Sequence, residues 1–196
     1  MKIFLKILVC VTVISVLFSS LSFESTCRML EQDVLRLHIL ANSDIDADQK
    51  LKLSVRDAVI KELSPLYDNV KDKNQAKIIT QQNLKKVETI ASDVIAEYGF
   101  NYDVEVKLCS EFFDTRYYEN FTMPAGVYDS LVINIGQAKG KNWWCVMYPT
   151  LCVGASSSDS MKKDLTQQEY DVVSAGEYEF RFKIVEFFKK MYLYFC

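Results

Sequence analysis

The sequence predicts an α+β protein with a mostly antiparallel sheet, two central helices on one face of that sheet, and an amphipathic helix at the carboxyl end. The first observation is the order of the periodic segments: one strand, two helices, a run of strands and a last helix. Strands that follow one another, rather than alternating with helices, favour antiparallel pairing. The second observation is that 196 residues with 49% hydrophobic content suffice for one domain with a substantial core.

Residues 1–22 have the layout of a secretory signal peptide. Two lysines precede an apolar run of twelve residues, Ile7 to Phe18, and two serines stand at the third and first positions before an expected cut ahead of Phe23. The apolar run is short for a membrane span, which needs about 20 residues. An uncleaved amino-terminal anchor is the alternative. Either segment places the rest of the chain outside the cytoplasm.

Residues 23–152 form the predicted α+β domain, which begins with a strand over Val34–Ala41. Apolar and polar residues alternate in this strand at period two, which gives it one apolar and one polar face. A helix over Asp48–Leu63 and a longer helix over Asn74–Tyr98 follow, each with an apolar stripe at helical spacing. Because both stripes need a surface to cover, we expect these helices to pack on the sheet.

The remaining strands follow in a cluster. Tyr102–Leu108 alternates between apolar and charged residues, as a half-buried strand does. Phe112–Glu119 and Val127–Ile135 are rich in β-branched and aromatic residues, and Pro124–Gly126 supplies a turn between them. These segments predict a central hairpin that leads into a loop with two tryptophans.

Two segments follow the predicted domain. Residues 153–176 begin with a polar, serine-rich stretch that predicts an arm, in which Thr166 and Glu169 have the spacing of a capping box. Residues 177–196 form the predicted amphipathic helix, with aromatic residues mostly on one side and charged residues mostly on the other.

Composition and motifs exclude several ligands. The net charge of −3 and the lack of a basic stripe argue against a nucleic-acid partner. Gly136–Asn142 is one residue too short for a phosphate-binding loop and has no Ser or Thr after its lysine. The acidic run Asp44–Asp48 lacks the later glycine and glutamate of a calcium loop. We therefore expect no cofactor and no metal.

Catalytic motifs are incomplete as well. Asp114 and Thr115 resemble half of an aspartic protease site, but Arg116 stands where those enzymes carry glycine, and the second half is missing. His38 is the only histidine, and its pairing with a cysteine stays open, although no local signature accompanies it. We predict that the protein is not an enzyme. An exported hydrolase or thiol enzyme is the alternative.

Cys145 and Cys152 bound an eight-residue loop that also contains Pro149. Export favours disulfide formation, and closing such a loop stabilises the fold by roughly 2.5 kcal/mol. Zinc is the alternative, but two thiols without a nearby histidine make a poor site. We expect a disulfide-closed loop, whereas the remaining exported cysteines, Cys27, Cys109 and Cys196, receive no role.

Trp143 and Trp144 are adjacent, so on a strand one faces the core and the other faces outwards. Exposed tryptophan, tyrosine and arginine side chains dominate the energetics of protein interfaces. We therefore predict that Arg116, Trp143, Trp144 and Tyr148 bind a partner. The alternative is that the second tryptophan packs under the polar arm or the last helix.

Four segments carry a resemblance to a known family. They read LRLHILANSD (35–44), KLSVRDAV (52–59), MPAGVYDSLVINIG (123–136) and AKGKNWWCVMYPTLC (138–152). Together they resemble the stage II sporulation protein R family of endospore-forming Firmicutes. The resemblance covers residues 35–152 well, weakens over the polar arm, and returns in the last helix.

This resemblance implies a place and a partner. Members of the family are understood to be made in the forespore and exported into the space between the forespore and mother-cell membranes. There they activate a membrane-embedded aspartic protease of the mother cell, which processes the precursor of a sigma factor. The resemblance implies that this chain is the activating ligand and works close to a membrane surface.

Overall fold

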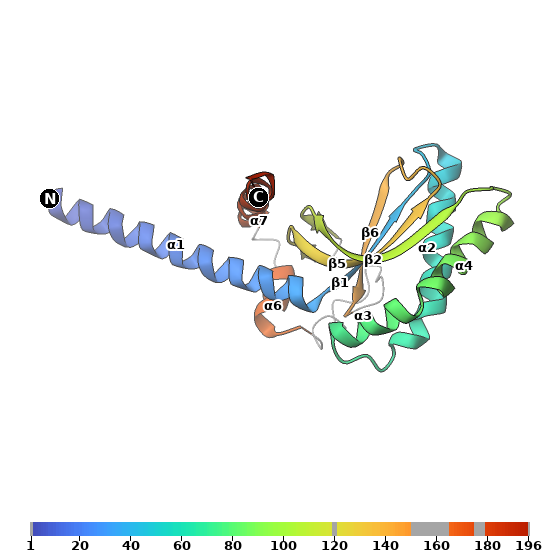
Figure 1. Cartoon of the computed structure of the whole chain (residues 1–196). Coiled ribbons are helices and arrows are strands. Elements are labelled where there is room, and N and C mark those ends of the chain that lie inside the picture. Colours follow the sequence, from blue (N-terminus) through green and yellow to red (C-terminus); the bar gives the residue numbers. More distant parts are fainter. Residues whose placement is uncertain (1, 119–120, 150–164, 175–178, 196) are drawn as a thin grey trace.

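The computed structural model describes residues 2–118, 121–149, 165–174 and 179–195 of the chain. Its helices are α1 (Lys2–Asp33), α2 (Asp46–Tyr67), α3 (Lys73–Gln82), α4 (Leu84–Glu97), α6 (Gln167–Ser174) and α7 (Glu179–Phe195). Its strands are β1 (Leu35–Leu40), β2 (Val104–Phe113), β3 (Arg116–Tyr117), β4 (Thr122–Met123), β5 (Gly126–Ile135) and β6 (Asn142–Tyr148). Figure 1 shows the sheet with α2 and α4 on one side and α6 and α7 on the other.

The main sheet has the strand order β2-β5-β1-β6 and is mostly antiparallel, as the sequence predicts. β2 with β5 and β1 with β6 are antiparallel, whereas β1 and β5 are parallel. Leu37 on β1 stands opposite Leu131 on β5 and Cys145 on β6, which fixes the register at the centre. The parallel pair arises because α2, α3, α4 and β2 intervene between β1 and β5 and return the chain to the same edge.

Helices α2, α3 and α4 cover one face of this sheet and enclose the larger apolar core. Alternating residues of β1 (Leu35, Leu37, Ile39) and of β5 (Leu131, Ile133, Ile135) meet the helices there. The single helix predicted over Asn74–Tyr98 is wrong, because Asn83 divides it into α3 and α4. The Asn83 side chain donates to the carbonyl of Ile79 (2.8 Å) and so satisfies a carbonyl near the end of α3. The helix predicted over Asp48–Leu63 extends to Tyr67, so Pro65 lies inside α2 and does not end it.

The opposite face is covered by distant parts of the chain. The carboxyl-terminal part of α1, the β3–β4 hairpin, α6 and α7 form a second apolar cluster around Leu30, Phe113, Met123 and Phe182. Glu31 joins these parts, since its side chain pairs with Lys189 of α7 and accepts from the backbone nitrogen of Val127 (3.1 Å). A Cβ at Gly126 would collide with that same carboxylate. A larger residue at position 126 would therefore have to displace the Glu31 side chain from these partners.

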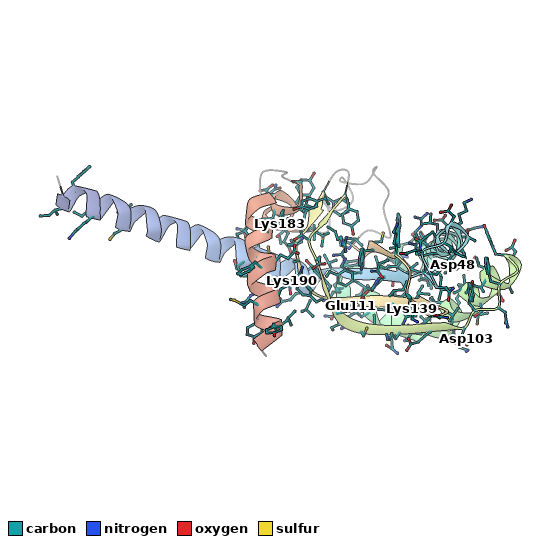
Figure 2. The ribbon with its side chains drawn as sticks, turned by 90° about the horizontal axis from the view of Figure 1, so that it is seen from above. Asp48, Asp103, Glu111, Lys139, Lys183 and Lys190 are labelled. Carbon is teal, nitrogen blue, oxygen red and sulfur yellow. The ribbon has the colours of Figure 1, made fainter. Side chains whose placement is uncertain are left out.

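The amino-terminal half of α1 projects away from the rest of the molecule (Figures 1 and 2). Ile3, Phe4, Ile7 and Val11 are exposed on this part, whereas Phe23 is buried against Phe182, with ring centroids 5.3 Å apart. Within the described residues, no helix is long and apolar enough to cross a membrane.

The predicted disulfide between Cys145 and Cys152 is not seen. Cys145 carries a free, buried thiol, and Cys152 lies outside the described residues. Strand parity places Cys145 on the same face as Leu37 and Met147, where it points into the core under the helices. A bonding partner would have to enter that core.

At the end of the chain, the start of α6 agrees with the sequence, whereas the burial of side chains in α7 does not follow the predicted aromatic side. Glu169 accepts from the backbone nitrogen of Thr166 (2.8 Å), and its own backbone nitrogen donates to the Thr166 hydroxyl (3.3 Å). This reciprocal pair is a capping box and confirms the predicted start of α6. In α7, Phe182 is buried, whereas Phe187 and Met191 of the predicted aromatic side are exposed.

Candidate functional site

The sheet face opposite α2–α4 carries a group of side chains that we name the arginine–aromatic cluster. Its members are Arg36, His38, Phe113, Arg116, Tyr118 and Trp144. Strand alternation places Arg36 and His38 there, because their neighbours on β1 face the helices. The cluster thus combines residues of β1, β2, β6 and the β3–β4 hairpin.

Arg36 is completely buried although it is an arginine. Its guanidinium carbon lies 4.3 Å from the ring centre of Phe113 and 5.2 Å from that of Tyr128. Its Nη2 donates to the Tyr118 hydroxyl (2.7 Å), whereas Nε and Nη1 have no hydrogen-bond partner among the described residues. Two aromatic faces and one neutral hydroxyl are weak compensation for a buried cation.

Trp144 lies between two cationic or polar partners. The guanidinium carbon of Arg116 is 3.4 Å from its ring centre, and the His38 ring stacks on it with centroids 5.5 Å apart. The Tyr118 hydroxyl also donates to the Trp144 carbonyl (3.3 Å). Trp144 is therefore held in one orientation, which lowers the entropy that it loses when a partner binds.

His38 has both ring nitrogens engaged. Nδ1 lies 2.8 Å from a carboxylate oxygen of Glu111, and Nε2 lies 3.0 Å from the side-chain oxygen of Asn142. Within the described residues, neither nitrogen is hydrogen-bonded to a thiol or a hydroxyl. This geometry orients the ring for packing on Trp144 and does not provide the base of a Cys–His pair.

Cys27 and Cys109 do not have the features of reactive cysteines. Burial raises the pKa of Cys27 to about 12. Burial, and then the charge of Glu111, raise the pKa of Cys109 as well. A nucleophilic cysteine needs the opposite shift, because the thiolate is the reactive form. In the part of the chain that the structure describes, no group of three His, Cys, Asp or Glu residues could hold a metal ion.

The structure separates the four predicted partner-binding residues. Arg116 and Trp144 contact one another in the cluster. Trp143 lies on the opposite face, where the guanidinium carbon of Arg56 on α2 is 4.3 Å from its ring centre. Tyr148 is buried in the core on that same face. Only Arg116 and Trp144 are thus placed to act together.

Sequence reasoning missed Arg36 and Tyr118. An arginine on the polar face of an alternating strand is ordinarily exposed to solvent, so its position in β1 predicts no burial. Tyr118 follows Arg116 in a segment that predicts only a strand. The one signal for Tyr118 is that three aromatic or basic side chains follow one another directly at Arg116–Tyr118, whereas Arg36 has no such signal.

A second polar network lies at the other end of the sheet, where β1 and β5 end. Asp48 is buried and accepts hydrogen bonds from Asn42 (2.8 Å), Ser43 (2.6 Å) and Tyr102 (3.1 Å). Burial alone would raise the pKa of Asp48, but these bonds outweigh it and lower the pKa. Figure 2 shows Asp48 far from Lys183 and Lys190 of α7. Because its bonds are internal, this network holds loops together and does not form a binding site.

The glycines of the neighbouring loop serve the same network. Gly136 has a φ of +57°, and a Cβ there would collide with the side chain of Asn42. A Cβ at Gly140 would collide with the backbone carbonyl of Ser43. The segments LRLHILANSD and MPAGVYDSLVINIG therefore meet at this point for structural reasons.

Fold and cluster define an α+β domain with an arginine-rich, aromatic sheet face. The family model "Stage II sporulation protein R (spore_II_R)" matches residues 31–158, which is more than half of the chain. The chain therefore belongs to the stage II sporulation protein R family, and this confirms the resemblance. Membership gives the chain a sporulation-related role in a family that is not named for an enzymatic reaction.

A curated relative agrees with the family assignment. The chain is 34% identical over 141 residues to "Stage II sporulation protein R" of Bacillus subtilis (strain 168). The match covers 72% of this chain and 63% of the relative, so the chain spans less than two thirds of that protein's length. No solved structure matches the chain.

Proposed function

We propose that this chain is an exported sporulation signalling protein that activates a membrane-embedded aspartic protease of the mother cell. The activated protease then processes the precursor of a sigma factor. Membership of the stage II sporulation protein R family supports this proposal. The signal-peptide layout of residues 1–22 supports export into the space between the forespore and mother-cell membranes.

The observation that carries the proposal is the contact of Arg116 with Trp144. A guanidinium stacked on a half-buried tryptophan combines the two residue types that contribute most to protein interfaces. Tyr118 donates to the Trp144 carbonyl and the His38 ring stacks on the Trp144 side chain, so the contact is formed before any partner binds. An activator needs such a surface, because it must bind the active state of the protease more tightly than the resting state.

The alternative, an exported hydrolase or thiol enzyme, receives less support from the described residues. The ring of His38 is bonded to Glu111 and Asn142, and burial keeps Cys27 and Cys109 protonated near neutral pH. Catalysis by cysteine requires a thiolate within reach of a base. The cluster is better suited to holding a partner than to reacting with one.

Reconstitution tests the proposal. The chain is co-expressed, with its export signal, in a non-sporulating host together with the membrane protease and the sigma-factor precursor. Cleavage of the precursor should require both the chain and the protease. An unchanged precursor in the presence of all three proteins contradicts activation. Cleavage by the chain without the protease would favour the enzyme alternative.

The expected cut before Phe23 has its own test, which is amino-terminal sequencing of the exported protein. Phe23 packs on Phe182, so cleavage at that point leaves the packed part of α1 with the domain. We expect the mature protein to begin at Phe23. A start at Met1 would instead favour the amino-terminal anchor.

A further inference from the structure

We propose that Arg36 and Arg116 together bind a carboxylate, supplied by an acidic side chain of the protein partner, and that the Tyr118 hydroxyl occupies this place in the free protein. The biological meaning of this site rests on the proposed function, but the site itself is a property of the chain that a small probe can test.

The first argument is that most N–H donors of Arg36 have no acceptor among the described residues. A guanidinium offers five N–H donors, and here only Nη2 has a hydrogen-bond partner among the described residues. The side chain is fully buried, so water does not take the place of these partners. Buried arginines are ordinarily paired with a carboxylate, because an isolated buried cation is strongly unfavourable.

The second argument is that every nearby carboxylate in the described part of the chain is already paired with another residue. Each of them forms a close contact with a histidine or a lysine and therefore has less negative charge to offer. The pairs are Glu111 with His38 (2.8 Å), Asp114 with Lys190 (2.7 Å), Glu186 with Lys190 (2.8 Å), and Glu31 with Lys189. Among the described residues, Arg36 and Arg116 form no ion pair.

The third argument is the position of Arg116. Its Nε is buried and has no hydrogen-bond partner within the described residues. Burial lowers the pKa of Arg116 and the positive charge of Arg36 adds to the lowering, whereas the carboxylates of Asp114 and Glu186 oppose it. The two guanidinium groups are thus close enough to repel each other. One negative charge beside both groups would relieve this repulsion and satisfy donors of each.

The aromatic surroundings favour a carboxylate over a phosphate. Phe113, Tyr128 and Trp144 present ring faces to the two guanidinium groups, and Arg36 is fully shielded from water. A singly charged carboxylate loses less hydration on entering such a place than a doubly charged phosphate does. A carboxylate is also the anion that a protein partner carries on its own side chains.

Tyr118 is the group that the ligand would displace. Its hydroxyl contacts both Arg36 Nη2 and the Trp144 carbonyl, and its ring stacks on Phe121 with centroids 4.5 Å apart. It follows β3, which pairs only with β4 in a two-stranded sheet separate from the main one. A charged oxygen accepts from a guanidinium about twice as strongly as a neutral hydroxyl, so exchange is favourable.

The experiment uses N-acetyl-glutamate N-methylamide as the probe and the matching glutamine compound as its neutral control. The exported protein, isotope-labelled, is titrated with each compound while the Nε–H signals of Arg36 and Arg116 are followed by nuclear magnetic resonance. The glutamate compound should shift both signals in a saturable way, and the glutamine compound should not. No shift, or equal shifts with both compounds, would overturn the proposal.

Variants assign the effect to the site. Arg36→Met should abolish the response, and Arg116→Met, at a less buried position, provides the same test if the first variant does not fold. Tyr118→Phe removes only the competing hydroxyl and should bind the probe several-fold more tightly. Arg56→Met is the matched control, because Arg56 also lies over a tryptophan but on the opposite sheet face. A response that survives in both cluster variants, or is lost in Arg56→Met, would contradict the site.

Inorganic phosphate at equal ionic strength forms a separate arm of the titration. A larger response to phosphate than to the glutamate compound would overturn the assignment to a carboxylate. The probe titration requires no protease, so its outcome is distinguishable from that of the reconstitution. If precursor processing succeeds while the probe fails to bind, the carboxylate site is wrong and the proposed function stands.

Discussion

The two faces of the central sheet differ in how completely their groups are satisfied. The face under α2–α4 is lined by aliphatic side chains that are almost entirely buried. The face under α1, α6 and α7 also has an apolar cluster, but it encloses a buried arginine, a second arginine on a tryptophan, and donors without partners among the described residues. One face can be explained by stability alone, whereas the other cannot.

This difference indicates where function is to be sought. An apolar core is built to minimise free energy, and nothing in it gains from a further contact. Burying a charge without a counter-ion is unfavourable, so it is retained only where other interactions offset its free-energy cost. Such residues concentrate at functional sites. We therefore expect substitutions on the helix-covered face to act through stability and those in the arginine–aromatic cluster to act through binding.

The largest effect should come from the helix-covered core. Leu37 is buried between Leu131 and Cys145, so Leu37→Ala leaves a cavity that its neighbours cannot fill. We expect a loss of about 3 kcal/mol in the free energy of unfolding, measured by urea denaturation. The fraction that remains folded should activate normally. A stable variant that fails to signal would contradict the division between the two faces.

The next effect concerns the two tryptophans. Trp144→Ala should weaken partner binding by about 2 kcal/mol, or roughly thirtyfold in the concentration that activates the protease. Trp143→Ala, on the other face under Arg56, should lower stability but leave activation per folded molecule unchanged. Dose–response measurements on protein with a verified circular dichroism spectrum would separate the two effects. Equal losses of activation in the two variants would contradict the view that one face serves binding and the other serves stability.

The sequence predicted much of the helix-covered face because its elements are periodic. The alternation in Val34–Ala41 and the stripe of Asp48–Leu63 each reflect burial against one neighbouring layer. The break at Asn83 was not predicted, because the apolar stripe continues across it and only the side-chain bond to Ile79 reveals it. The local sequence pattern therefore predicted that helices cover this face of the sheet, but it did not predict that α3 and α4 are separate helices.

The arginine–aromatic cluster was less accessible to sequence reasoning because it is assembled from distant segments. Arg36 becomes buried only when the hairpin and Phe113, about eighty residues further along the chain, fold over it. The disulfide between Cys145 and Cys152 stays a prediction, because Cys152 lies outside the described residues. What the structure adds is that strand parity directs the Cys145 side chain into the core.

A smaller effect, of opposite sign, is expected at Arg36. Arg36→Met replaces an uncompensated cation by a side chain of similar length, so the free energy of unfolding should rise by about 1 kcal/mol. Activation should be lost at the same time. Thermal and urea unfolding of both proteins measure the first effect. A variant that is less stable than the native protein would indicate that Arg36 serves the fold and not a ligand.

The smallest effect concerns an ion pair outside the cluster. Asp129 on β5 accepts from Lys73 (3.0 Å) and Lys77 (2.9 Å) of α3 and from Ser110 (2.9 Å). Burial alone would raise the pKa of Asp129, but these bonds outweigh it and lower the pKa from 3.8 to about 2. Because the folded value is the lower one, the carboxylate stabilises the fold above about pH 4, and this contribution disappears as the pH falls through 2.

Asp129→Asn should therefore lower the free energy of unfolding by about 1 kcal/mol at pH 7 and by progressively less towards pH 2. Urea unfolding at several pH values measures the difference between the two proteins. Glu62→Gln is the control, because Glu62 pairs with Lys86 at 3.5 Å on the open surface and should show no measurable change. A difference that stays constant between pH 7 and pH 2 would mean that Asp129 acts through packing. The coupling of α3 to the sheet would then not depend on its charge.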